Sequence, residues 1–239
     1  MKKVFLLIIA VIVCGVASVY AQHDEEHFWP PDYRQISRNI QDPATSFYYP
    51  RLMQRFLAGD PTLSLQEGRH LYFGAVFQPW FTTADNPHYN QLLVSVLRRT
   101  TFTDQDYADI LRFSQALLDE DPFNLRALES QLIVHAHYGN TVEYARIQQK
   151  RRVVLLAISS TSDGMSPDTP FFVTRMAHQF DILPFFGLHF GGEARVVRNR
   201  GILNIFSRNR RTVNYVTLTP NPFGIPRYYF DITPMMRRM

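Results

Sequence analysis

The stretch TDQDYADILRFSQALLDEDPFNLRALESQLIVHAHYGN, residues 103–140, decides the fold of the first half of the chain. Apolar side chains recur at helical spacing over residues 107–118, and Asp121-Pro122 ends this pattern. A second helical pattern runs from about residue 124 to 138 and closes at Gly139. The stretch therefore predicts two consecutive helices, a helical hairpin.

Helical patterns continue on both sides of this hairpin. Residues 48–57 carry helical spacing, Ser64 and Glu67 form a capping-box pattern that opens a second helix, and residues 89–98 resume the spacing. We therefore expect residues 48–158 to be helical. The preceding segment, 22–47, begins with a polar stretch containing Trp29-Pro30-Pro31, which cannot be helical, and we expect an extended N-terminal arm there.

The chain changes character from about residue 161. A turn at Thr161-Ser162-Asp163-Gly164 precedes a predicted strand at 171–175 and a predicted short helix at 177–186. After Gly191-Gly192 the hydrophobic pattern takes a period of two residues. This pattern predicts three strands, at 202–206, 213–218 and 227–232. Helices followed by strands predict an α+β fold with a small C-terminal antiparallel sheet. We expect one domain over residues 48–239, in which residues 161–233 have mixed structure and are rich in strands.

The central hairpin resembles a tetratricopeptide repeat. The resemblance covers little more than one repeat, Thr103 to Ala145, with a terminal Asp-Pro followed by a helix that ends at Gly139. A repeat array needs about three repeats to bury a continuous core. We therefore expect an N-terminal helical bundle that contains one such hairpin and not a solenoid.

Several motifs together resemble a family of exported bacterial proteins classed as a domain of unknown function. They are the segments AGDP at 58–61, LYFGAVFQP at 71–79, DPFN at 121–124, SDGMS at 162–166 and YYFDI at 228–232. The resemblance extends over most of the chain from residue 22 onward. It implies a single exported domain, and it implies no activity and no catalytic residues.

Residues 1–21 have the composition of a secretory signal peptide. Lys2 and Lys3 precede an uncharged apolar segment, Val4–Ala17, and Val19 and Ala21 supply small residues for cleavage before Gln22. The apolar segment is shorter than the ~20 residues that cross a bilayer, so we expect no transmembrane segment after cleavage. We expect an exported protein, periplasmic or secreted.

Cleavage also removes the only cysteine, Cys14. The processed chain would then have no cysteine nucleophile, no cysteine-ligated zinc and no thiol redox chemistry. The pattern His23-Asp24-Glu25-Glu26-His27 matches H-x-x-E-H, but it lies next to the cleavage point and before two prolines, without the packed helix that a zinc site requires. We expect no metal and no cofactor.

Charge is distributed unevenly along the processed chain. Residues 22–190 carry 14 basic and 19 acidic residues, whereas residues 191–239 carry nine arginines and two acids. Guanidinium groups suit planar, bidentate partners such as carboxylates and phosphates. We expect a partner-binding patch for an envelope protein or an acidic envelope polymer, and we expect no nucleic-acid partner. The patch consists of six arginines: Arg195, Arg198, Arg200, Arg208, Arg210 and Arg211.

The sequence gives little support for catalysis. It contains no G-x-S-x-G elbow and no glycine-rich phosphate loop, and we assign no catalytic residue. We therefore expect a non-enzymatic binding or interaction module. The alternatives are a hydrolase with a cryptic site built from Asp163, Ser166 and His178, and a purely structural partner of an envelope complex.

Overall fold

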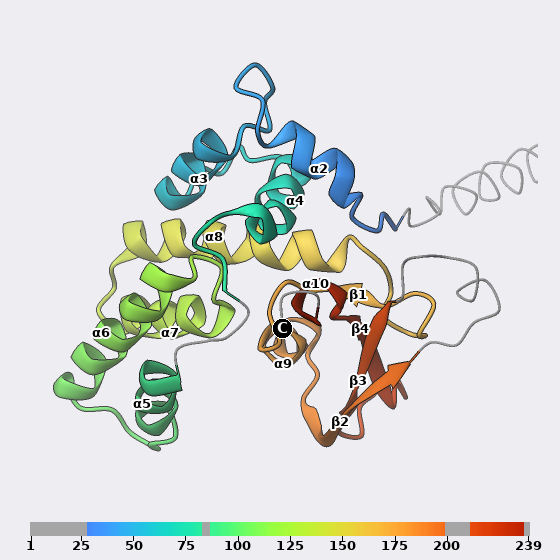
Figure 1. Cartoon of the computed structure of the whole chain (residues 1–239). Coiled ribbons are helices and arrows are strands. Elements are labelled where there is room, and N and C mark those ends of the chain that lie inside the picture. Colours follow the sequence, from blue (N-terminus) through green and yellow to red (C-terminus); the bar gives the residue numbers. More distant parts are fainter. Residues whose placement is uncertain (1–27, 83–86, 199–210, 237–239) are drawn as a thin grey trace, which may run out of the picture.

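Helices come first and strands last in the computed structural model, which describes residues 28–82, 87–198 and 211–236 (Figure 1). This order confirms the α+β fold. The predicted signal peptide at 1–21 lies outside the described residues. No helix in the described part of the chain combines the length and apolar composition needed to cross a membrane.

Among the described residues, the helical part contains seven α-helices and one 3₁₀ turn. They are α2 (Tyr33–Asn39), α3 (Tyr49–Ala58), α4 (Leu65–Gly74), η1 (Ala75–Phe77), α5 (Pro87–Leu97), α6 (Asp104–Glu120), α7 (Leu125–His137) and α8 (Thr141–Ser159).

Side-chain caps fix where several of these helices begin. The predicted capping box at α4 is confirmed, since Ser64 and Glu67 each bond to the other's backbone N–H. Thr103 and Asp106 form the same box at α6, and Asn124 accepts from the backbone N–H of residue 127 at the start of α7. Each cap stabilises its helix by about 1 kcal/mol. The central hairpin therefore starts and stops where the sequence predicts.

The N-terminal segment 22–47 is not wholly extended, so part of that prediction was wrong. Its middle forms α2, which Asp32 caps by accepting from two backbone N–H groups. Ile36 and Ile40 lie one helical turn apart and are buried, at 5% and 2% exposure. This apolar pair packs the segment against the helical bundle, and burial of that kind outweighs the extended bias of the prolines before it.

The described apolar core consists of two clusters that meet at α8. One cluster lies among α5, α6 and α7 and includes Ile147 of α8. The other joins α2, α3 and α4 to the sheet and includes Val154 and Ile158 further along α8. Figure 1 shows α8 running across the molecule from the side of α6 and α7 to the side of the sheet. This one helix thus connects the helical part to the strand-rich part.

The C-terminal part is a four-stranded sheet with two short helices and a 3₁₀ turn. Its elements are β1 (Phe171–Phe172), α9 (His178–Asp181), η2 (Leu183–Phe186), β2 (Phe190–Arg198), β3 (Thr212–Leu218), β4 (Arg227–Asp231) and α10 (Thr233–Met236).

The strand order is β1-β4-β3-β2. The pairs β2–β3 and β3–β4 are antiparallel and β1–β4 is parallel, so the sheet is mixed and mostly antiparallel. The strands predicted at 213–218 and 227–232 are confirmed as β3 and β4, while the strand predicted at 171–175 shortens to β1.

Strand β2 was not predicted from the sequence. The period-two pattern was expected only after Gly191-Gly192, but the strand begins at Phe190 and passes through the glycines with a register shift between Phe190 and Ala194. Gly192 has φ 99° and Gly191 packs against the backbone of Leu218, so the glycines form an irregularity within a strand. The strand predicted at 202–206 lies outside the described residues.

Candidate functional site

Three strands align charged and aromatic residues in rows across one face of the sheet. Arg195 of β2 lies opposite Tyr215 of β3, which lies opposite Tyr229 of β4. Thr217 and Arg227 are paired in the next row. Because side chains alternate between the two faces of a strand, these five residues share one face, here called the outer face.

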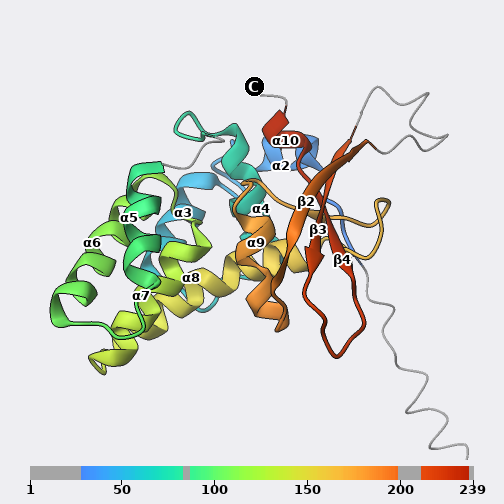
Figure 2. The same ribbon diagram turned by 90° about the horizontal axis from the view of Figure 1, so that it is seen from below.

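The other face of the sheet packs against α9. Asn214, which alternates with Tyr215 along β3, donates to the side-chain oxygen of Gln179 on α9, and both residues are buried. Val216 and Phe230 lie on the same side and are fully buried. Figure 2 shows the body of helices on this side of the sheet, with the outer face turned away from it.

Side chains of the outer face contact one another while staying open to solvent. The Arg227 guanidinium lies 4.8 Å from the centre of the Tyr215 ring, and the Tyr215 and Tyr229 rings meet at 6.4 Å in an edge-on arrangement. Tyr215 donates to Glu193 Oε1 at 3.0 Å, and Arg195 Nε lies 2.6 Å from the same oxygen. The Arg195 side chain is nevertheless 73% exposed.

These contacts determine the protonation state of the Tyr215 hydroxyl. Partial burial, followed by the hydrogen bond to Glu193 and its negative charge, raises the pKa of Tyr215, and the guanidinium groups of Arg195 and Arg227 oppose that rise. Tyr215 therefore remains a neutral hydrogen-bond donor at physiological pH. The face presents guanidinium and phenol groups together, which suits planar anions and apolar rings.

The structure describes three of the six arginines predicted to form the patch. Arg195 lies on the outer face, Arg198 ends β2 opposite Thr212, and Arg200, Arg208 and Arg210 lie outside the described residues.

Arg211 contributes to the fold at one edge of the outer face. Its Nε lies 3.8 Å from the buried Asp231 carboxylate, and its guanidinium lies 5.4 Å from the centre of the Phe172 ring. Arg227, in contrast, was missing from the predicted patch. The alternation of Arg227 and Tyr229 with buried residues along β4 was the signal that places it on the outer face.

A second group of polar residues lies buried between the helices and the sheet. The Thr174 backbone N–H donates to the Tyr72 hydroxyl at 3.1 Å, and that hydroxyl lies 2.7 Å from His178 Nδ1. His178 Nε2 lies 3.1 Å from the Phe123 carbonyl oxygen. Since a carbonyl only accepts, Nε2 carries the proton and Nδ1 accepts from Tyr72.

An ion pair lies beside this chain of hydrogen bonds. Arg175 Nε contacts Asp121 Oδ2 at 3.1 Å, with both side chains below 10% exposure, and the Arg175 guanidinium lies 4.7 Å from the centre of the Phe81 ring. Burial, and then the charge of Arg175, lowers the pKa of His178 to about 3. We call these residues, Tyr72, Asp121, Arg175 and His178, the buried network.

The buried network occupies both ring nitrogens of His178 inside the core. A general base must reach its substrate's proton, directly or through one water. His178 is 1% exposed, and Tyr72 is fully buried. The network therefore ties the α6–α7 turn and α4 to the segment before α9, and its geometry gives it no access to a substrate.

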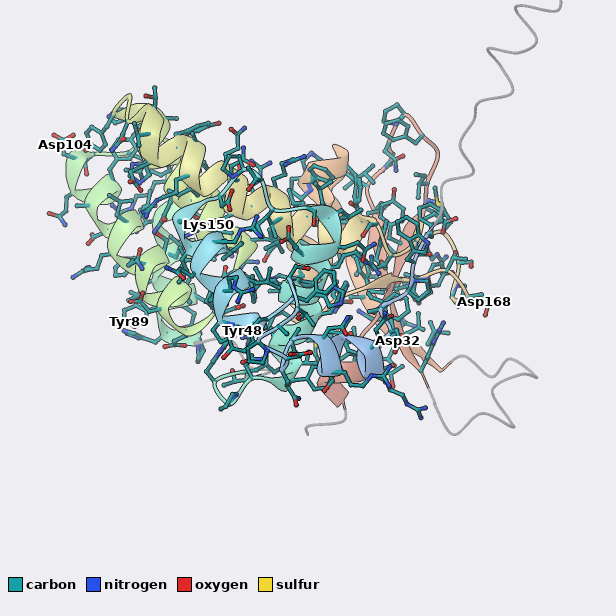
Figure 3. The ribbon with its side chains drawn as sticks, turned by 90° about the horizontal axis from the view of Figure 1, so that it is seen from above. Asp32, Tyr48, Tyr89, Asp104, Lys150 and Asp168 are labelled. Atoms are coloured by element: carbon teal, nitrogen blue, oxygen red, sulfur yellow. The ribbon has the colours of Figure 1, made fainter. Side chains whose placement is uncertain are left out.

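The alternative hydrolase site is not assembled. Asp163 and Ser166 belong to one exposed loop, where Thr169 bonds to both side chains at 2.7 and 2.9 Å. Figure 3 shows Asp168 of this loop at the margin of the molecule. His178 makes its bonds inside the core instead, so the three residues do not form a catalytic unit. Within the described residues, no group of three or more His, Cys, Asp or Glu side chains is placed to hold a metal.

Comparison with known families covers nearly the whole described chain. A family model described as a domain of unknown function, DUF4919, matches residues 34–239. The chain belongs to the DUF4919 family. Neither a curated protein nor a solved structure matches it. The function of this DUF4919 chain is therefore inferred from the side chains of the site itself.

Proposed function

We propose that this chain is an exported, non-enzymatic binding protein of the bacterial envelope whose outer face holds an acidic partner. The observation that carries the proposal is the placement of Arg195 and Arg227 around Tyr215 and Tyr229 on the face turned away from the helices. Among the described residues of that face, Glu193 is the only exposed carboxylate.

The chemistry of the outer face suits an anion. A guanidinium group binds carboxylate or phosphate through two parallel N–H donors, and a phenol adds an apolar surface with a polar tip. The nine arginines and two acids of residues 191–239 also give this end of the chain a positive field that attracts acidic partners. The signal-peptide pattern of residues 1–21 supports an envelope location.

Retention on anionic envelope material, measured over a salt gradient, tests the proposal. We expect the double substitution Arg195→Gln and Arg227→Gln to lower the salt concentration that elutes the protein, because two cations are lost from the binding face.

The matched control is Arg112→Gln with Arg146→Gln. Both are exposed helical arginines in short-range ion pairs, so the control removes the same charge from the other part of the molecule. The control should elute as the wild type does. Equal elution of both double variants would show that binding follows net charge and not the outer face, and would refute the proposal.

A further inference from the structure

Among the described strands, β2 forms one edge of the sheet. In the order β1-β4-β3-β2 it has β3 on one side, and no other described strand pairs with its second side. Open edges are commonly protected by bulges, prolines or very short strands. Here the irregularity lies between Phe190 and Ala194, and the five residues Ala194–Arg198 pair regularly with β3. That regular half carries no proline.

The register shows which backbone groups face the open edge. Leu218 N–H donates to Pro226, and Ile232 N–H donates to Thr212, so the even-numbered residues of β3 bond toward β4. The odd-numbered residues, Val213 and Tyr215, therefore bond toward β2. Their partners are Val197 and Arg195. By alternation, the N–H and C=O groups of Ala194 and Val196 point away from the sheet.

The two sides of this edge differ in chemistry. Arg195 projects on the outer face, with Tyr215 beside it. Ala194 and Val196 project on the α9 side, and both are exposed, Val196 at 52%. Phe190 continues this apolar row at 43% exposure and packs edge-on against Phe180. The edge thus pairs a basic row with an apolar row on opposite sides of the same backbone.

We propose that the acidic partner binds this edge as an added strand. The partner would be an extended protein segment with acidic side chains beside Arg195 and apolar side chains beside Ala194 and Val196. Backbone hydrogen bonds to Ala194 and Val196 would supply affinity, and the alternating side chains would supply specificity. This inference rests on the proposed function and names the class of its partner.

The existing contacts of Arg195 allow it to leave Glu193 and pair with an acidic residue of the partner. Its ion pair with Glu193 joins two exposed side chains, and such pairs contribute little to stability. An acidic residue on the added strand would lie directly opposite Arg195, where cross-strand charge pairs are favourable. A second copy of this chain fits less well, because it would bring together two ends that each carry nine arginines and two acids.

Binding of a fluorescent peptide in which valine and glutamate alternate tests the added strand. Ala194→Pro removes the N–H that points to solvent and leaves the bonds to β3 in place. We expect it to weaken peptide binding at least about tenfold, equivalent to roughly 1.4 kcal/mol. The control Ala194→Val keeps both the N–H and an apolar side chain, so a loss confined to the proline variant assigns the effect to the N–H. Val196→Asp, which keeps every N–H, should also weaken binding, and it replaces the proline variant if that variant unfolds.

A charge exchange tests the side-chain half of the inference. Arg195→Glu should lose the valine–glutamate peptide and bind a peptide in which valine and lysine alternate. Peptide binding that is unchanged in Ala194→Pro and Val196→Asp would overturn the added strand. So would dimers of the wild type that Ala194→Pro abolishes while no peptide binds, because a second copy would then occupy the edge.

The same variants separate this inference from the proposed function. Ala194→Pro should leave salt-dependent retention on nonpeptide anionic envelope polymers intact, since Arg195 and Arg227 remain. If that retention depends on the two arginines but no variant affects the peptide, the proposed function stands and the added strand fails. If the wild type binds neither the polymers nor the acidic peptide, both fail.

Discussion

The buried network and the outer face are built from the same kinds of side chain but differ in their access to water. Each contains arginine, tyrosine and a carboxylate. In the buried network the Arg175 side chain is 3% exposed and contacts Asp121, whereas on the outer face the Arg195 side chain is 73% exposed and contacts Glu193.

This difference separates a structural role from a binding role. A buried charge is costly unless it is paired, so removing one partner of a buried pair disturbs the fold. An exposed pair contributes little to stability and exchanges readily with a ligand. We therefore expect the residues of the buried network to contribute most to stability. We expect the residues of the outer face to be available to a partner.

The largest expected effect comes from breaking the buried ion pair. Arg175→Met keeps an apolar stem in place of the arginine methylenes and removes the charge, so Asp121 loses its guanidinium partner in the core. We expect the free energy of unfolding to fall by about 3–5 kcal/mol, as for other buried pairs. Chemical denaturation measures this change.

A double-mutant cycle tests whether the cost comes from the pair. Asp121→Asn in the Arg175→Met background removes the charge left behind and should restore part of the lost stability. Arg195→Met serves as the exposed control, with an expected change below about 0.5 kcal/mol. Equal losses at residues 175 and 195 would contradict the distinction between the two groups.

A smaller effect is expected from acid, acting through His178. Its pKa falls to about 3 in the folded protein, below its ordinary value of 6.5, so the unfolded chain binds more protons between those values. The stabilising contribution is therefore present at neutral pH and is lost as the pH falls through this range. It amounts to about 2 kcal/mol between roughly pH 7 and pH 5.

The variant His178→Gln isolates this contribution. Glutamine does not titrate, and it can still donate to the Phe123 carbonyl and accept from Tyr72. The variant is expected to be less stable at neutral pH and to lose less stability on acidification. Denaturation curves at several pH values would count against the assignment if the wild type and the variant lost stability in parallel.

The sequence predicted the helices well because their signals are local. Helical periodicity, the capping residues Ser64 and Thr103, and the break at Asp121-Pro122 all act within one or two turns. The strands β3 and β4 were predicted for the same reason. Strand β2 was missed because Gly191-Gly192 signals a break locally, while pairing with β3 carries the strand through it.

The sites depend on contacts that local patterns do not contain. Tyr72 and His178 lie 106 residues apart in sequence, so their hydrogen bond follows from the tertiary fold alone. The outer face required the strand register, which places Arg195 beside Tyr215 and adds Arg227 to the set. Charge counting located the basic end of the chain, but it could not separate Arg195 from Arg211, which contacts a buried carboxylate.

The smallest expected effects come from removing one hydroxyl from each group. Tyr72→Phe removes the atom that accepts from Thr174 and donates to His178, leaving two buried groups without that bond. We expect a loss of about 1–2 kcal/mol in the free energy of unfolding. Tyr229→Phe, on the half-exposed outer face, should change stability by less than about 0.5 kcal/mol because it keeps the ring that meets Tyr215. If thermal and chemical denaturation instead ranked Tyr229→Phe as the more harmful change, the outer face would be a stabilising element of the fold and a poor candidate for binding.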